Sequence, residues 1–225
     1  MKAMILAAGR GQRMMPLTES TPKPMLQVNG QPLLTYHINR LKLAGISDIV
    51  INLAWCGEVI EQYYGDGSEF GVKVTYCYEP AGGLETAGGI VNALPLLTES
   101  EDAFIVVNGD VFTDYDVAAL TQLQLYAGEA HIVLVENPEH NLDGDFCLAN
   151  QIVNTQKYTF SGIGLYTRDF FSSLSVGVLP LGPLLRRSIE TGRVSMELYL
   201  GLWSDIGTPQ RLMEINKNQE QNSVG

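Results

Sequence analysis

A glycine-bearing segment with two cations near the start of the chain could bind an oxygen-rich anion. It reads LAAGRGQRM over residues 6–14 and continues through PLT to TPKP at 21–24. Glycines and small residues let backbone N–H groups approach phosphate oxygens closely. Arg13 offers a planar fork of donors, and Lys23 a compact charge whose flanking prolines restrict its backbone. The segment therefore predicts a phosphate site with Arg13 and Lys23 as its cations.

The glycine spacing alone would not justify this prediction. Gly9 and Gly11 fit GxG, but Met14 stands where a dinucleotide-binding fingerprint has its third glycine, and no GK[ST] completes a Walker A loop. For GxG by itself, a glycine-rich turn between a strand and a helix is the better interpretation. The whole string together with the TPKP segment favours a function.

Two aspartates follow extended segments and could hold a divalent cation. Asp110 ends the sequence VNGD after the apolar run 104–107, and Asp205 lies in WSDIGTP just before an expected helix. Ligands of open α/β sheets gather outside the carboxyl ends of the strands, where the glycine-bearing segment also lies. Two carboxylates completed by phosphate oxygens and water form a usual Mg²⁺ site. The alternative is that both are loop aspartates that cap the next element.

Together these groups suit a reaction in which a phosphate monoester attacks a triphosphate. Charge repulsion is the main obstacle, so positioning and neutralisation supply the catalysis and no protein nucleophile is needed. The sequence indeed lacks a convincing Ser-His-Asp or Cys-His set. We interpret the three histidines as structural or solvent-exposed; they are His37, His131 and His140.

Hydrophobic patterning predicts the elements that must position these groups. Short apolar runs alternate with amphipathic segments, which is typical of an α/β fold with a mostly parallel sheet covered on both faces. Thr208 and Pro209 supply an N-cap and a first helical residue for the last helix. We expect strands at 2–6, 48–53, 72–78, 104–107, 130–135, 158–166 and 194–203, and helices at 32–44, 59–64, 86–97, 181–189 and from 208 onward.

Composition limits the class of protein. The 225 residues carry a net charge of −11 and are 45% hydrophobic, which predicts a single domain over 1–225 with a polar tail from about residue 216. So acidic a chain argues against nucleic acid or a membrane surface as partner, and no apolar stretch is long enough to span a bilayer. The three scattered cysteines are typical of reduced thiols in the cytoplasm; they are Cys56, Cys77 and Cys147.

From residue 1 to about 214 the chain resembles the sugar-phosphate nucleotidyltransferases. The resemblance rests on LAAGRGQRM…PLT…TPKPM, on VNGD and on WSDIGTP. It implies a Rossmann-like fold without a C-terminal β-helix, the cofactor Mg²⁺, and a nucleoside triphosphate and a sugar 1-phosphate as small-molecule partners. Asp110 and Asp205 would bind the metal, and the implied nucleotide-binding residues are Leu6, Ala7, Ala8, Gly9, Gly11, Gln12, Glu79, Gly83 and Leu84.

Within the family, the segments GLET, GDFCL and FSGI favour transfer of UMP from UTP to N-acetylmuramic acid α-1-phosphate in peptidoglycan recycling. Guanylyl transfer to mannose 1-phosphate, thymidylyl transfer to glucose 1-phosphate, and a nucleotide-sensing module without turnover are the alternatives. The expected sugar contacts are Gly144, Asp145, Ser161 and Gly162, although Ser161 and Gly162 also fit a tightly packed strand. The sequence predicts no oligomeric state.

Two positions depart from the family pattern, and one substituent of the sugar has candidate partners. The stretch 154–157 reads NTQK where many relatives have Glu-Lys-Pro, so no sugar-phosphate lysine is assigned there. Met15 stands where several relatives have an arginine, and it is given no phosphate role.

Arg186, Arg187 and Arg193 could pair with the lactyl carboxylate of a muramic sugar, or could simply be solvated helix charges.

Overall fold

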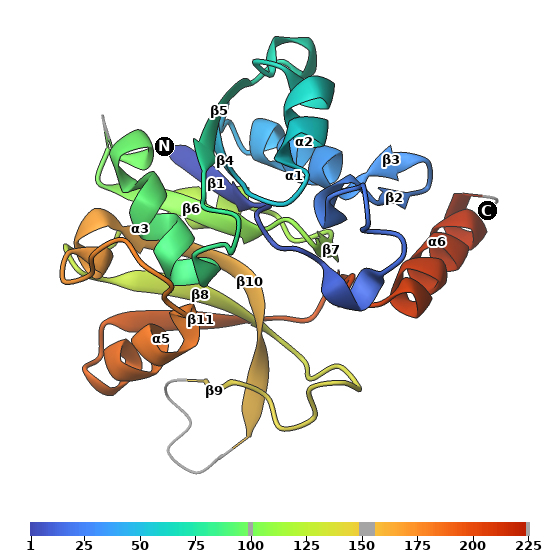
Figure 1. Ribbon diagram of the computed structural model, residues 1–225. Coiled ribbons are helices and arrows are strands. Elements are labelled where there is room, and N and C mark those ends of the chain that lie inside the picture. Colours follow the sequence, from blue (N-terminus) through green and yellow to red (C-terminus); the bar gives the residue numbers. More distant parts are fainter. Residues whose placement is uncertain (99–100, 149–155, 224–225) are drawn as a thin grey trace.

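The computed structural model describes residues 1–98, 101–148 and 156–223 and shows one α/β domain, as expected (Figure 1). In the described chain an 8-stranded mixed sheet has the order β11-β8-β10-β6-β1-β4-β5, and β9 pairs with β10. Strands β5, β4, β1 and β6 are mutually parallel, and β10 runs antiparallel between β6 and β8. The strands are β1 (Lys2–Leu6), β4 (Asp48–Leu53), β5 (Lys73–Tyr78), β6 (Ala103–Asn108), β8 (Ala130–Val135), β9 (Phe146–Cys147), β10 (Lys157–Thr167) and β11 (Val194–Tyr199).

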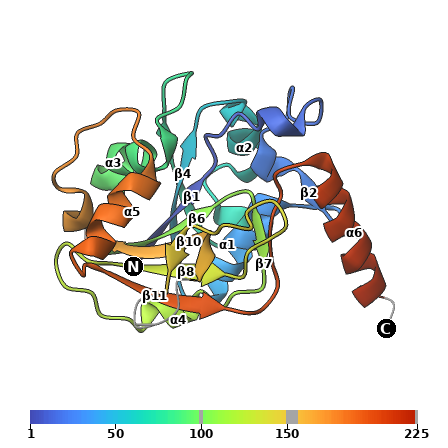
Figure 2. The same cartoon turned by 90° about the horizontal axis from the view of Figure 1, so that it is seen from below.

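Helices cover both faces of the sheet and leave two cores (Figure 2). In β1, Ala3 and Ile5 belong to one core and Met4 to the other, because successive side chains alternate across the sheet. Both sets are fully buried, which explains why the central strands read as apolar runs. The first core lies under α1 (Leu33–Leu43), α2 (Gly57–Tyr64) and α4 (Ala118–Thr121), and the second under α3 (Glu85–Leu97) and α5 (Leu181–Glu190).

Two short ribbons stand apart from the main sheet. One joins β2 (Gln27–Val28) to β3 (Gln31–Pro32), and the other joins β7 (Val111–Thr113) to β12 (Trp203–Asp205). The single extended run expected at 194–203 was wrong: β11 ends at Tyr199, and β12 pairs with a different strand. The chain leaves the main sheet at Leu200 and Gly201, which lie in neither strand.

Helix α6 (Pro209–Ser223) follows the second ribbon at the edge of the molecule (Figure 1). The Thr208 hydroxyl accepts a hydrogen bond from Arg211 N at 3.4 Å, the N-cap contact that the sequence predicted. The segment from residue 216, which the sequence predicts to be a polar tail, is helical through Ser223. Asn216 supports this turn by accepting from Asn29 N at 2.7 Å and donating to Gln27 O at 3.2 Å. Among the described residues, no helix is both long and apolar enough to cross a membrane.

Candidate functional site

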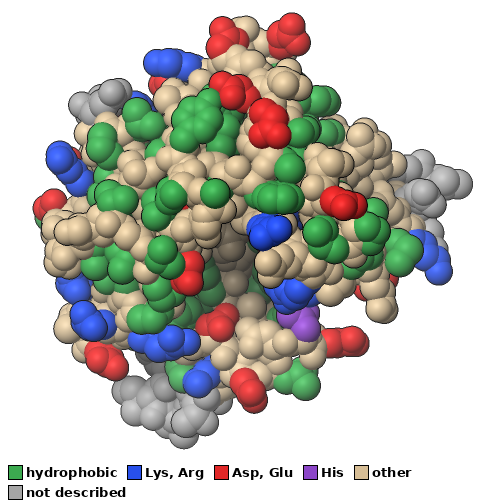
Figure 3. Space-filling model, in the orientation of Figure 1, with side chains coloured by type: hydrophobic (Ala, Val, Ile, Leu, Met, Phe, Trp, Pro, Cys, Tyr) green, Lys and Arg blue, Asp and Glu red, His purple; other side chains and the backbone are tan. Residues whose placement is uncertain are grey.

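A cavity of about 770 Å³ opens at the carboxyl ends of β5, β4, β1 and β6. Figure 3 shows the molecule hollowed there, with acidic, basic and histidine side chains at the rim. Strand β1 lies between β4 and β6, so this is the point where successive connections diverge and where α/β sheets bind ligands. The lining includes Leu6, Ala8, Gly9, Arg10, Gly11, Gln12, Arg13, Lys23, Asn52, Trp55, Glu79, Gly83, Leu84, Glu85, Thr86, Asn108, Asp110 and Gly207.

The loop after β1 is fixed from behind so that its polar side faces the cavity. Gly11 has φ of 62°, and an added Cβ would lie 3.0 Å from Thr18 Cγ2, so glycine is required there. The buried Thr18 donates its hydroxyl to Gly11 O at 2.8 Å. Met14 is fully buried and anchors the short turn that carries Arg13. At Gly9 a Cβ would meet nothing within 4 Å, so the loop leaves open space on its cavity side.

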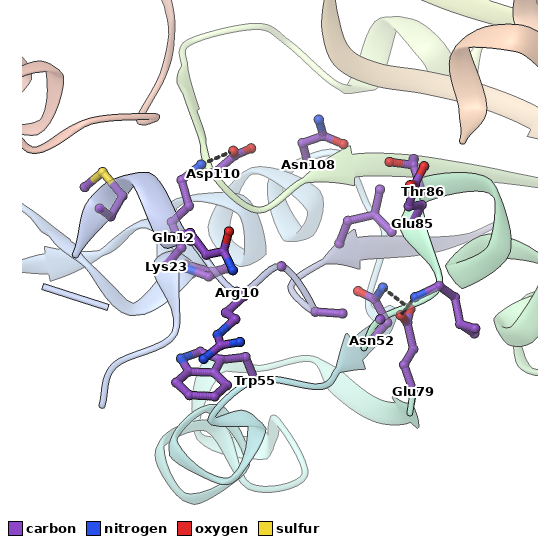
Figure 4. Close-up of a pocket in the computed structure, with 18 of the residues that line it drawn as sticks. Arg10, Gln12, Lys23, Asn52, Trp55, Glu79, Glu85, Thr86, Asn108 and Asp110 are labelled. Carbon is purple, nitrogen blue, oxygen red and sulfur yellow. Dashed lines mark hydrogen bonds and ion pairs between the residues drawn. The ribbon is translucent and has the colours of Figure 1, made fainter. Parts of the chain in front are cut away.

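Lys23 and Asp110 form an ion pair at one end of the cavity (Figure 4). Lys23 lies in a short helical turn whose preceding residue, Pro22, is extended, as a proline-braced backbone should be. Asp110 follows Gly109, where an added Cβ would come within 2.7 Å of Leu6 O and 3.0 Å of the Pro24 ring. The glycine therefore lets the VNGD segment pack against both β1 and the TPKP segment.

The β7–β12 ribbon brings Asp205 beside Asp110. Asp205 pairs with Val111 in the ribbon, and Ile206 N donates to Asp110 O at 2.8 Å. The Asp205 carboxylate forms an ion pair with Arg211, and His140 Nε2 lies 3.0 Å from the same oxygen. Neither His140 nor Arg211 is expected beside Asp205 from the sequence.

The donor chemistry of these two carboxylates suits a magnesium ion. Both side chains are partly exposed, at 31% for Asp110, which directly precedes β7, and 21% for Asp205, which ends the paired strand β12. The described residues contain no group of three His, Cys, Asp or Glu side chains able to hold a metal. Mg²⁺ commonly takes one or two carboxylates and completes its shell with substrate phosphates and water. The pair fits that pattern, and the assignment of the metal remains a proposal.

A hydrogen-bonded chain forms the opposite wall of the cavity (Figure 4). Asn52, at the end of β4 and only 3% exposed, accepts from Ala7 N at 2.7 Å and donates to Glu79 Oε1 at 2.6 Å. The second oxygen of Glu79 accepts from Leu84 N at 2.8 Å. On α3, a Cβ at Gly89 would come 2.5 Å from Glu79 Oε1, so the helix approaches this chain closely. Three of the expected nucleotide-binding residues, Glu79, Gly83 and Leu84, therefore lie together at the cavity.

A second cavity of about 300 Å³ adjoins the first and shares Glu85, Thr86 and Asn108 with it. Of the four expected sugar contacts, Asp145 lines this cavity, and its carboxylate accepts from Phe160 N at 2.9 Å. The other lining residues include Phe146, Leu181 and Arg186.

Gly144, Ser161 and Gly162 do not line either cavity. Ser161 is buried and accepts from Ile163 N at 3.1 Å. Gly162 has φ of 81°, and an added Cβ would lie 2.6 Å from Asn108 Nδ2. Ser161 and Gly162 support the wall from behind, which fits the tight-strand interpretation. Of the stretch 154–157 that lacks the Glu-Lys-Pro pattern, Asn154 and Thr155 lie outside the described residues.

Several cavity residues were missed by the sequence analysis. Asn52 and Asn108 could have been found, because a polar residue at or next to the end of an apolar strand, on the sheet's carboxyl edge, indicates a site. Arg10 and Trp55 meet only in three dimensions, with the guanidinium carbon 4.5 Å from the ring centroid. Glu85 lines both cavities and has φ of 56°, which side chains rarely adopt.

The electrostatics of the cavity leave cationic groups available to an anion. Neither Arg10 nor Arg13 forms an ion pair with any residue that the structure describes. Lys23 is held by Asp110, so its charge is positioned beside the candidate metal carboxylates. The arrangement can bind a polyphosphate along the loop after β1. Thr86 and Asn108, which line both cavities, would then lie between the polyphosphate and a second ligand in the smaller cavity.

Comparisons with known proteins agree with this arrangement. Residues 2–144 match the family described as Nucleotidyl transferase. The chain is 52% identical to an N-acetylmuramate alpha-1-phosphate uridylyltransferase of Neisseria meningitidis serogroup B, over 95% of this chain and 96% of that protein. It is 27% identical to a UTP–glucose-1-phosphate uridylyltransferase of Synechocystis, over 86% of this chain and 52% of that one.

The fold also matches a solved structure. A provisionally assigned glucose-1-phosphate thymidylyltransferase from Bacillus anthracis, in complex with a sucrose, superposes with a TM-score of 0.83 at 24% identity, covering 96% of this chain and 94% of that one. At this identity the match concerns the fold alone. The family match covers well over half of the chain and includes the loop after β1 and Asp110. The chain belongs to the nucleotidyl transferase family.

Proposed function

We propose that the protein transfers UMP from UTP to N-acetylmuramic acid α-1-phosphate and releases pyrophosphate. The 52% identity to a uridylyltransferase of that name, over nearly the full length of both chains, carries the choice of substrates. The geometry supports the class of reaction. Two arginines without an ion-pair partner among the described residues, and a lysine–aspartate pair, line one cavity that shares residues with a second.

In the proposed reaction a phosphate oxygen of the sugar 1-phosphate attacks the α-phosphorus of UTP. A new phosphorus–oxygen bond forms, and the bond to the oxygen bridging the α- and β-phosphates breaks, so that pyrophosphate leaves with the electron pair. Lys23 and Arg13 lie where they can stabilise the charge on the transferred and departing phosphates. A magnesium ion held by Asp110 and Asp205 would neutralise phosphate charge when bound.

The uridine and the sugar would occupy different cavities. The base would lie against the wall formed by Asn52, Glu79 and Leu84 in the larger cavity. The sugar would occupy the smaller one, where Asp145 can accept hydroxyl hydrogen bonds. Arg186, whose guanidinium lies 6.0 Å from the Phe146 ring, is the cation available for the lactyl carboxylate. Neither Arg187 nor Arg193 lines this cavity.

Pyrophosphate release across a panel of substrates tests the proposal. The protein is incubated with N-acetylmuramic acid, N-acetylglucosamine, glucose or mannose 1-phosphate, each with UTP, dTTP or GTP and Mg²⁺. We expect the highest kcat/KM for UTP with the muramic sugar, and a selective loss for that sugar in Arg186→Gln. Preference for mannose 1-phosphate with GTP, or glucose 1-phosphate with dTTP, would refute the substrates and keep the family. Binding of nucleotide without any turnover would indicate a sensing module.

A further inference from the structure

Arg10 is a cavity residue whose position depends on an aromatic ring from another loop. Its guanidinium carbon lies 4.5 Å from the centroid of Trp55, which follows β4. Trp55 is itself fixed, because Nε1 donates to Thr18 O at 2.9 Å, and the Thr18 hydroxyl donates to Gly11 O. One indole side chain thus contacts the loop after β1 on both sides of Gly11. Figure 4 shows Arg10 and Trp55 together at one side of the cavity.

Holding an arginine by a ring differs from holding it by a carboxylate. Stacking occupies a face of the guanidinium and leaves its five N–H donors, which lie in the plane, free for phosphate oxygens. It also leaves the positive charge uncancelled, whereas an ion pair would not. This matters in a chain with 25 acidic and 14 basic residues. Arg10 has no acidic partner in the described parts of the chain, although both it and Trp55 line the cavity.

The location of the pair indicates which phosphates it would meet. The second cavity shares Glu85, Thr86 and Asn108 with the first but includes neither Arg10 nor Trp55. In Figure 4, Glu85 and Thr86 lie across the cavity from the Arg10–Trp55 pair, so the pair is remote from the sugar side.

On the basis of the proposed function, we infer that Arg10 binds the β- and γ-phosphates, which depart as pyrophosphate, and that Trp55 is its positioning residue. Arg10 forms charge-assisted hydrogen bonds through its in-plane donors. Trp55, itself anchored through its bond to Thr18 O, contacts no phosphate in this scheme and acts by fixing the plane of the Arg10 guanidinium.

Binding of inorganic pyrophosphate with Mg²⁺, measured by calorimetry, tests the inference without either substrate. We expect Arg10→Gln to weaken the affinity by about tenfold or more, whereas Arg168→Gln, which removes an exposed arginine elsewhere, leaves it unchanged. Trp55→Leu should also weaken binding, and Trp55→Phe should restore a large part because it keeps a ring face. The double variant Arg10→Gln/Trp55→Leu should bind as weakly as Arg10→Gln alone, because Trp55 acts only through Arg10.

Two further results separate this inference from the proposed function. The intrinsic fluorescence of the protein should change on pyrophosphate binding, and this change should disappear in Trp55→Phe. Normal affinity in Arg10→Gln, or multiplicative losses in the double variant, would overturn the inference even if the substrate panel behaves as proposed. The expected binding pattern in a protein that fails the substrate panel would instead overturn only the choice of substrates.

Discussion

The hydrogen-bonded position of Asn52 gives a prediction that can be worked out in detail. Its side chain joins Ala7 N, in the loop after β1, to the Glu79 carboxylate, at 2.7 and 2.6 Å. The amide orientation is settled by chemistry, because Ala7 N must donate and an ionised carboxylate must accept. Asn52→Ala removes both contacts and leaves the buried Ala7 N–H without a partner. A bond to a charged group contributes about 1.5–3 kcal/mol and an unsatisfied N–H costs about 1–3 kcal/mol, so we expect a loss of about 3–5 kcal/mol.

Asn52→Asp separates the two contacts. The new carboxylate can still accept from Ala7 N, but it then faces Glu79 Oε1 where an amide donor had been. Two carboxylates in contact at this partly buried position retain a shared proton in the folded state, which raises the pKa of the pair. A raised folded-state pKa means that the folded protein binds the proton more tightly than the unfolded chain. The destabilisation should therefore be largest at high pH and should shrink as the pH falls.

Urea unfolding of wild type, Asn52→Ala and Asn52→Asp at pH 8 and pH 5.5 checks both statements. The loss for Asn52→Asp relative to wild type should be smaller at the lower pH, whereas the loss for Asn52→Ala should change much less. An equal loss for Asn52→Asp at the two pH values would mean that Asn52 does not meet the Glu79 carboxylate. A loss below about 1 kcal/mol for Asn52→Ala would refute the role of the side chain as a link.

Three other perturbations have defined outcomes. Burial, assisted by the charge of Arg40, lowers the pKa of His37 to about 4. The unfolded chain therefore takes up the proton first as the pH falls, and the free energy of unfolding should decrease by up to about 3 kcal/mol between pH 6.5 and pH 4. Unfolding titrations of His37→Gln should lack this contribution to the pH dependence. Because Glu85 has φ of 56°, Glu85→Gly should relieve about 1–2 kcal/mol of backbone strain against about 0.5–1 kcal/mol of added chain entropy, and a clear fall in melting temperature would contradict this. Gly162→Ala should lose both stability and turnover by displacing Asn108, whereas Gly30→Ala, at φ of 75° with open space around it, should lose stability alone.

The main elements could be predicted because the burial of each follows from the hydrophobic pattern of a short stretch of sequence. Strands 48–53 and 130–135 have the predicted bounds, and the Thr208 cap begins the last helix as expected. The predictions that differ concern exposed or long-range structure. The β7–β12 ribbon depends on pairing across about ninety residues, and the middle of α6 is held against β2 by Asn216; neither contact leaves a local pattern in the sequence.

The site divides in the same way. The residues of the loop after β1 and the two aspartates have a recognisable order along the chain, and the structure brings Arg13, Lys23 and Asp110 to one cavity. Gly162 has the sequence context of a contact residue, but its positive φ and its packing on Asn108 show a backbone requirement instead. The residue type alone does not show whether a glycine contacts a ligand or meets a requirement of the backbone.

The β7–β12 ribbon also bears on how the protein assembles. The eight-stranded sheet is complete with residues 2–199, whereas Asp205 and Arg211 reach the site only through pairing of 203–205 with 111–113. Contacts so distant in sequence carry a large loop-closure cost and tend to form late in folding. A state with an intact sheet and an open ribbon would therefore keep the loop after β1 and Asp110 in place, but Asp205 would no longer lie beside Asp110. In such a state the protein would bind nucleotide without turning it over, and pairing of the ribbon would couple binding to turnover.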